Sequence, residues 1–169
     1  LPQIERVAET IMTTSSADSP LKGLPYLLKA VAGLTEEFPN LHLNILGKLN
    51  QGGAASKLIE ELELGSKVSF FSDISTSEIV MLYAKASCAV VPSLYEGFGL
   101  PAGEAMACEV PIVSTDGGAL PEVVGEAGLI VSTGDHKALG ESIAYFLRNP
   151  DLRKEYGEKG RERIVKKFS

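Results

Sequence analysis

The stretch Ser87–Thr115, SCAVVPSLYEGFGLPAGEAMACEVPIVST, decides the fold. Its first part, SCAVVP over residues 87–92, is apolar at successive positions, which is typical of a strand covered on both faces. A glycine-rich turn follows, and a helix is expected over Pro101–Ala107, because proline suits the first turn of a helix. A second apolar run covers Val110–Thr115. Strand, helix and strand in this order predict two parallel strands joined by a crossover helix.

The same alternation extends along the whole chain. Apolar runs predict further strands at Arg6–Thr13, Leu41–Gly47, Lys67–Phe71 and Gly128–Val131. Amphipathic stretches predict further helices at Leu24–Glu37, Ala55–Leu62, Ser75–Ala86, Leu120–Gly125, Lys137–Arg148 and Leu152–Lys167. The predicted fold class is therefore α/β: a Rossmann-like, doubly wound parallel sheet of about six strands with helices on both faces. Ligands of such sheets bind at the carboxyl ends of the strands.

Composition narrows the class of protein. A chain of 169 residues with 44% hydrophobic residues suits one domain with its own core. Residues 1–150 hold 18 acidic and nine basic side chains, so we expect no nucleic-acid partner, because phosphate contacts need clustered lysine and arginine. The sequence has neither a signal peptide nor a run of about 20 apolar residues. The first predicted strand begins almost at once, which suggests a piece of a longer protein.

Cysteine and histidine give no sign of a metal site. Cys88 and Cys108 lack the spacing of a metal site or a disulfide framework, which favours a reducing, cytoplasmic compartment. His42 and His136 have no partner at ligand spacing, so both are expected to be structural.

The loop after residues 87–92 carries the first candidate site. Gly97 and Gly99 permit positive φ and close approach of a ligand, and the helix that follows offers free N–H groups to an anion such as phosphate. Glu96 and Glu104 flank this position. Ionised carboxylates accept hydrogen bonds from hydroxyls, so a ligand with a polyol on each side of its phosphates fits both. The alternative is that Glu104 only complements the helix dipole and Glu96 is solvated.

The run Ser93–Val131 resembles the donor-binding half of the group-one family of retaining nucleotide-sugar glycosyltransferases, whose GT-B architecture pairs two Rossmann domains. Their Glu-x7-Glu hallmark is matched by Glu96 and Glu104, and the similarity extends along nearly the whole chain. The resemblance implies that Glu96 contacts the transferred hexose and Glu104 the ribose. It also implies that the backbone amides of Phe98, Gly99 and Leu100 hold sugar and phosphate.

The loop Thr13–Gly23, TTSSADSPLKG, supplies the second candidate. Taken alone, Lys22 is most simply a solvated lysine before a helix, but the resemblance implies that it neutralises the donor diphosphate and assists its departure. Lys22 and Glu96 are thus the expected catalytic residues. Similar enzymes carry an arginine five or six residues earlier, where this chain has Ser16 and Ala17. Hydroxyls of this loop, or a cation from another domain, are the alternatives for its role.

The resemblance also implies the surroundings of the site. Ile74 is a candidate for a contact with the base. Residues 1–169 would form the donor domain, with an N-terminal acceptor domain absent from this chain, which would be inactive alone. Donor and acceptor would be a nucleotide diphosphate sugar and a sugar, lipid or other hydroxyl compound, with no bound metal or permanent cofactor. By its charge pattern, the basic run Arg153–Lys167 is most simply a solvated helix face; the alternatives are that it faces the missing domain or the inner face of an acidic membrane.

A dehydrogenase-type module is disfavoured by the sequence, whereas other functions of the same architecture stay open. A dehydrogenase-type module needs a Gly-x-Gly-x-x-Gly turn after the first strand, and TTSSADSPLKG has no such glycines. A sugar-nucleotide epimerase or a non-catalytic nucleotide-sugar binding module of the same architecture remains the alternative. Sugar, base and acceptor are not indicated by any residue pattern.

Overall fold

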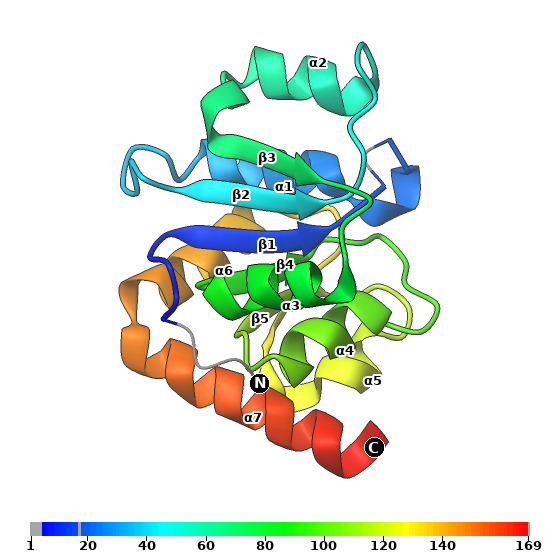
Figure 1. Ribbon diagram of the computed structural model, residues 1–169, viewed down its shortest axis with the longest axis vertical. Coiled ribbons are helices and arrows are strands. Elements are labelled where there is room, and N and C mark those ends of the chain that lie inside the picture. The colour runs from blue at the N-terminus through cyan, green and yellow to red at the C-terminus, as the bar shows by residue number, and fades with distance from the viewer. Residues whose placement is uncertain (1–4, 17, 169) are drawn as a thin grey trace.

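A computed structural model describes residues 5–16 and 18–168, which form one six-stranded parallel sheet (Figure 1). The strands are β1 (Thr10–Thr14), β2 (His42–Leu46), β3 (Val68–Phe71), β4 (Cys88–Val91), β5 (Ile112–Thr115) and β6 (Leu129–Val131). Their order in the sheet is β3-β2-β1-β4-β5-β6. The order reverses between β1 and β4, which defines a doubly wound Rossmann-like sheet and confirms the predicted fold class.

Helices cover both faces of the sheet. They are α1 (Leu24–Ala32), α2 (Ala54–Glu61), α3 (Thr76–Lys85), α4 (Leu100–Ala107), α5 (Leu120–Val124), α6 (His136–Arg148) and α7 (Pro150–Phe168). Helices α1, α2 and α6 contribute to one apolar cluster, and α3, α4 and α5 to the other. The long helix α7 runs past the carboxyl half of the chain and packs against α4 and α6 (Figure 1).

The central strands supply both apolar clusters at once. Ile11 of β1 belongs to the cluster under α1, and the next residue, Met12, belongs to the cluster under α4. Val90 and Val91 of β4 divide in the same way. Successive side chains of a strand point to opposite faces, so a strand buried on both faces is apolar throughout. This is the physical reason for the unbroken apolar runs in the sequence.

The expected strand Arg6–Thr13 is wrong over its first four residues, because β1 begins at Thr10. Glu9 has a φ of 60°, a left-handed conformation that interrupts an extended chain. The Arg6 guanidinium has a different role, since it donates to four carbonyl oxygens at the ends of two helices. These acceptors are Tyr83 O at 2.6 Å, Ala84 O at 2.8 Å, Cys108 O at 3.0 Å and Glu109 O at 2.8 Å. The last carbonyls of a helix have no partner inside it, and five guanidinium N–H groups suit them.

Helix ends differ from the expected ones by a few residues. The helix expected to reach Glu37 ends at Ala32, where the Gly33 N–H closes it on Lys29 O at 3.2 Å. Leu34 and Phe38 remain buried beyond this end, so their apolar spacing continues without a helix. The last helix begins at Pro150, two residues earlier than expected.

Three arginines of the basic tail bind backbone carbonyls of other helices. Arg153 donates to Phe146 O at 2.7 Å, Arg161 to Ala107 O at 2.5 Å, and Arg163 to Val123 O at 2.8 Å. These carbonyls lie at or near the carboxyl ends of α6, α4 and α5. Within the described part of the chain, no helix has the length and apolar character that a membrane span requires.

Candidate functional site

Lys22 and Glu96 meet where the strand order reverses. Lys22 ends a short 3₁₀ helix after β1, and Glu96 lies in the loop after β4, the neighbouring strand. The Lys22 Nζ atom lies 2.6 Å from Glu96 Oε1 and 3.4 Å from Oε2. Parallel neighbours end at the same edge of a sheet, and this reversal is where doubly wound folds bind ligands. The structure therefore joins two predicted site residues that are 74 positions apart.

Glu96 is buried and has one oxygen with spare capacity. Its residue is 6% exposed, and its Oε1 accepts from Lys22 and from the Ser93 hydroxyl at 3.1 Å. Among the described residues, Oε2 has only the long contact with Lys22. A carboxylate offers about four lone-pair positions, so Oε2 can accept a hydrogen bond from a ligand hydroxyl. Ser93 is not among the residues predicted from the sequence, because a serine three positions before a glutamate carries no distinct signal.

The loops that carry Lys22 and Glu96 are in direct backbone contact. Gly23, directly after Lys22, has a φ of 70°, and a Cβ at this position would overlap Pro92 O. The Leu94 N–H also donates to Leu21 O at 2.9 Å. Only glycine permits such a left-handed, closely approached position, so Gly23 lets the two loops lie against each other.

The loop after β5 supports the backbone of Glu96. Gly118 has a φ of 55°, and a Cβ there would overlap Glu96 O, while the next residue, Ala119, donates its N–H to the same oxygen at 2.8 Å. A glycine pair, Gly117–Gly118, forms this part of the loop. In the structure it permits the close approach of backbone to backbone. Glu122, in the first turn of α5, is exposed.

The second predicted carboxylate lies one turn into α4. Gly99, with a φ of 69°, is the N-cap of this helix, and Glu104 is exposed on it. Among the described residues, the Glu104 side chain has no hydrogen-bonded or ion-paired partner. Partial burial raises the pKa of its carboxyl above the ordinary value. A carboxylate one turn into a helix, with no partner among the described residues, can accept hydroxyl donors from a ligand.

Of the other predicted residues, Phe98 and Leu100 lie around the start of α4, and Ile74 lies in a different part of the structure. The Phe98 and Leu100 side chains are 83% and 66% exposed, so the loop before α4 projects from the core. Ile74 lies elsewhere, in a cavity of about 390 Å³ that it lines with Phe71 and Met81 beside α3. The structure therefore brings Lys22 and Glu96 together, and it places Ile74 in a different cavity.

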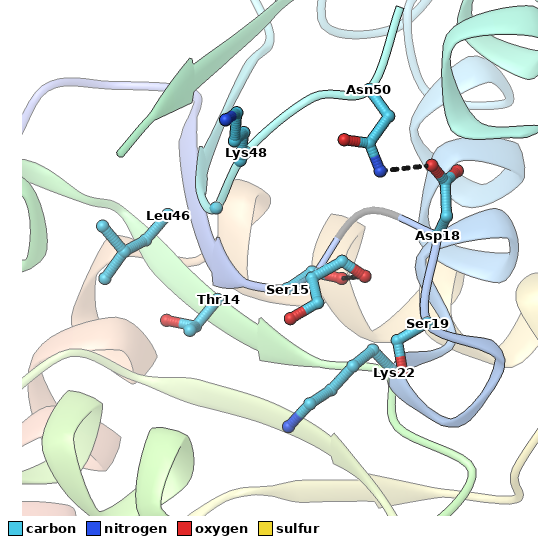
Figure 2. A pocket seen from close by; sticks show the side chains of 10 residues that line it. Thr14, Ser15, Asp18, Ser19, Lys22, Leu46, Lys48 and Asn50 are labelled. Carbon is cyan, nitrogen blue, oxygen red and sulfur yellow. Dashed lines mark hydrogen bonds between the residues drawn. The ribbon is translucent and has the colours of Figure 1, made fainter. Parts of the chain in front are cut away.

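A cavity of about 470 Å³ opens beside Lys22, at the ends of β1 and β2 (Figure 2). Its lining consists of Thr14, Ser15, Ser16, Asp18, Ser19, Lys22, Leu46, Gly47, Lys48 and Asn50. Of the two positions where an arginine was expected, Ser16 lines this cavity, and Ala17 lies outside the described residues. Lys48 and Asn50 are not predicted by the sequence, since a turn-rich GKLNQGG loop is equally typical of a solvated segment. In the part of the chain that the structure describes, no cluster of three or more His, Cys, Asp or Glu side chains could hold a metal ion.

Comparison with known proteins gives a consistent family. Residues 3–163 match the family model described as glycosyl transferases group 1. The chain is 43% identical over 171 residues to the MMP alpha-(1->4)-mannosyltransferase of Mycolicibacterium hassiacum. That alignment covers 99% of this chain and 41% of the relative, so the chain spans about two fifths of that protein's length.

Solved structures share the fold. The sucrose-phosphate synthase of Thermosynechococcus elongatus superposes with a TM-score of 0.80 at 33% identity, over 95% of this chain and 42% of that chain. TarM of S. aureus, whose crystals contained UDP, superposes with a TM-score of 0.87 at 23% identity, over 99% of this chain and 34% of that chain. At this lower identity the second likeness bears on the fold alone.

Proposed function

Because the chain belongs to the group 1 glycosyltransferases, we propose that it is the donor-binding domain of a retaining glycosyltransferase. It binds a nucleotide diphosphate sugar, and the sugar passes to an acceptor hydroxyl with its anomeric configuration kept. The observation that carries this proposal is the Lys22–Glu96 pair at the reversal of strand order. This pair places a cation for phosphate beside a carboxylate for hydroxyls, which is the combination that a sugar phosphate requires.

Lys22 and Glu96 have complementary roles in this proposal. The Lys22 side chain is 30% exposed, so its ammonium is accessible to a diphosphate. A cation fixed at this position stabilises the negative charge that develops on the departing nucleoside diphosphate. Glu96 is held by Ser93 and Lys22 through Oε1, and its Oε2 is available to a hydroxyl of the transferred hexose. The reaction proposed here uses lysine as its cation and needs neither a bound metal nor a permanent cofactor.

The start of α4 binds the rest of the donor. Glu104, which has no protein partner among the described residues, accepts from the ribose hydroxyls. The amides of Phe98, Gly99 and Leu100 lie between the two glutamates along the chain and contact the sugar and phosphate. Free N–H groups at a helix start favour anions. Ile74 is the weakest member of the set and would reach only the base.

The acceptor site belongs to a further domain in this proposal. The chain spans about 41% of the mannosyltransferase relative, so we expect a domain outside this chain to bind the acceptor, and the 169 residues alone to be inactive. The acceptor class is a sugar, a lipid or another hydroxyl compound. We place the protein in the cytoplasm. Arg153, Arg161 and Arg163 of the basic tail bind helix carbonyls, so we do not propose that these three side chains contact the inner face of a membrane.

Calorimetry with a panel of UDP- and GDP-linked sugars tests the donor role. Mannosyl donors come first because the 43% identical relative is a mannosyltransferase. We expect binding by the chain and a loss of about tenfold or more in Glu104→Gln, because a charge-assisted hydrogen bond contributes about 1.5–3 kcal/mol. Glu122→Gln, at an exposed position of α5, is the matched control and should bind like the unaltered chain. Equal affinity of Glu104→Gln for every donor would remove the ribose role.

A second experiment separates transfer from its alternatives. The longer protein that contains this domain should release nucleoside diphosphate faster when an acceptor is added. An epimerase would interconvert the sugar without acceptor-dependent release, and a binding module would do neither. Activity that persists in EDTA would support the absence of a metal requirement.

A further inference from the structure

The cavity at the ends of β1 and β2 contains a second lysine. Lys48 directly follows Gly47 at the end of β2, and it is exposed. Within the described residues, its ammonium has no hydrogen-bond acceptor and no ion-pair partner. Lys22, on the other side of the cavity, is engaged by Glu96. Lys48 therefore brings a positive charge to this cavity that no carboxylate contact offsets.

The single carboxylate that lines the cavity is already committed. Asp18 accepts from Asn50 Nδ2 at 2.9 Å, drawn as a dashed line in Figure 2, and from the backbone N–H of Ala55 at 3.0 Å. The hydrogen bond from Ala55, and then that from Asn50, lowers the pKa of the Asp18 carboxyl. Asp18 thus fastens the loop after β2 and the start of α2 to the loop after β1. Gly53 leaves room for this contact, since a Cβ there would lie 2.5 Å from Asp18 Oδ2.

Hydroxyl groups lie between the two lysines. Thr14, Ser15 and Ser16 line the cavity, and in Figure 2 Ser15 stands between the labelled Lys22 and Lys48 side chains. The loops are in contact here as well, because a Cβ on Gly47 would overlap Ser15 O. Both lysines are therefore mounted on segments whose separation is fixed by backbone contacts. The flexible four-carbon side chain of an exposed lysine allows its ammonium to reach a ligand that lies over these hydroxyls.

We propose that Lys48 is a further donor-binding residue, whose ammonium contacts the diphosphate. It replaces the arginine that similar enzymes carry shortly before Lys22, where this chain has Ser16 and Ala17. This inference rests on the proposed function. Lys22 is also paired with Glu96, so the net charge of the pair is close to zero, and a diphosphate brings more negative charge than Lys22 alone offsets. Lys48 adds the missing positive charge, and the Ser16 hydroxyl, which has no partner among the described residues, adds a neutral donor. The Ser15 hydroxyl already donates to Ser16 O at 3.4 Å, and the Thr14 hydroxyl shares a hydrogen bond with that of Tyr83 at 3.1 Å.

Binding of GDP, UDP and the corresponding monophosphates to the chain tests this role. Lys48→Gln should weaken binding of the diphosphates by about tenfold, and of the monophosphates by less, because the removed charge faces the second phosphate. The affinity of Lys48→Gln should also depend less steeply on salt than that of the unaltered chain. The matched control is Lys57→Gln, an exposed lysine of α2 that does not line the cavity, and it should bind like the unaltered chain.

Three results would overturn the inference, and they are distinguishable. If Lys48→Gln binds diphosphates like the unaltered chain, Lys48 is not a ligand-binding residue although the proposed function stands. If it loses the same factor for monophosphates and diphosphates, Lys48 contacts a part that both share, the nucleoside or the first phosphate, and the proposed contact with the second phosphate is wrong. If the unaltered chain binds none of the four nucleotides, the proposed function fails together with the inference. Because Lys48 is exposed, thermal unfolding of Lys48→Gln should match the unaltered chain.

Discussion

The Lys22 ammonium lies 2.6 Å from Glu96 Oε1, and the glutamate is 6% exposed. A diphosphate that approaches Lys22 therefore competes with Glu96 for the same N–H donors. The pair links stability and binding, because the cation that keeps a buried carboxylate compensated is also the cation proposed to bind the donor. Variants of Lys22 and Glu96 should therefore change both the free energy of unfolding and the affinity for the donor, and the two effects can be measured separately.

Lys22→Met should lower the free energy of unfolding by about 1–3 kcal/mol, because the buried Glu96 carboxylate loses its charged hydrogen-bond donor. Urea denaturation measures this loss, and calorimetry should show weaker binding of nucleoside diphosphates. The double variant Lys22→Met/Glu96→Gln should recover part of the lost stability, since no unpaired charge remains. Strictly additive losses in Lys22→Met, Glu96→Gln and the double variant would mean that the two side chains do not interact in solution.

Gly118→Ala tests whether backbone contact positions Glu96. Alanine at this position faces two penalties, a left-handed φ of 55° and an overlap with Glu96 O. The control is Gly52→Ala, because Gly52 has a φ of 76° and a Cβ there would meet no atom within 4 Å. Gly52→Ala should cost about 1 kcal/mol from the left-handed backbone alone, and Gly118→Ala clearly more. Donor affinity should fall only in Gly118→Ala. Equal donor affinity in both variants would mean that the backbone contact at Gly118 does not position Glu96.

Much of the sheet follows from the sequence because burial on both faces demands apolar residues at every strand position. The runs that become β4 and β5 are therefore visible without a structure. The prediction of a strand over Arg6–Glu9 is wrong, because the rule assigns to the strand any apolar residue that continues the run. Val7 and Ala8 extend the apolar run, while the carbonyls that hold Arg6 come from helices 77 to 103 positions away.

The site is predictable from the sequence only as a set of loops. A doubly wound sheet brings the loop after β1 next to the loop after β4, so Lys22 and Glu96 can be expected at one edge. Their direct ion pair depends on Gly23 and Gly118 holding three loops together, and no single-sequence pattern reports such contacts. Lys48 carries no signal because an exposed lysine in a polar loop is the commonest of arrangements.

Arg6→Met should destabilise the fold through the helix ends that it serves. Four carbonyl oxygens at the ends of α3 and α4 lose a charged donor, and hydrogen bonds to charged groups contribute about 1.5–3 kcal/mol each before solvent replaces them. We expect a loss of at least about 2 kcal/mol in chemical denaturation. Arg148→Met is the control, because its pair with Glu37 is exposed to solvent and its loss should change the free energy of unfolding little. Arg6→Lys should not restore stability, because an ammonium lacks the guanidinium fork; full recovery would contradict this explanation.

Glu104→Gln should change stability and binding in opposite directions, and the stability change should depend on pH. Partial burial raises the folded-state pKa of this carboxyl, so the ionised form is less favourable in the folded chain than in the unfolded one. The penalty is fully present above the raised pKa and disappears as pH falls below the ordinary carboxyl value of 4.5. Glu104→Gln should therefore raise the thermal midpoint at pH 7, with a gain that shrinks toward pH 4, while it weakens donor binding. Glu122→Gln should show neither effect. A Glu104→Gln chain that is less stable than the unaltered one at pH 7 would mean that the carboxylate is held by the protein itself, and would leave it unavailable to a ribose.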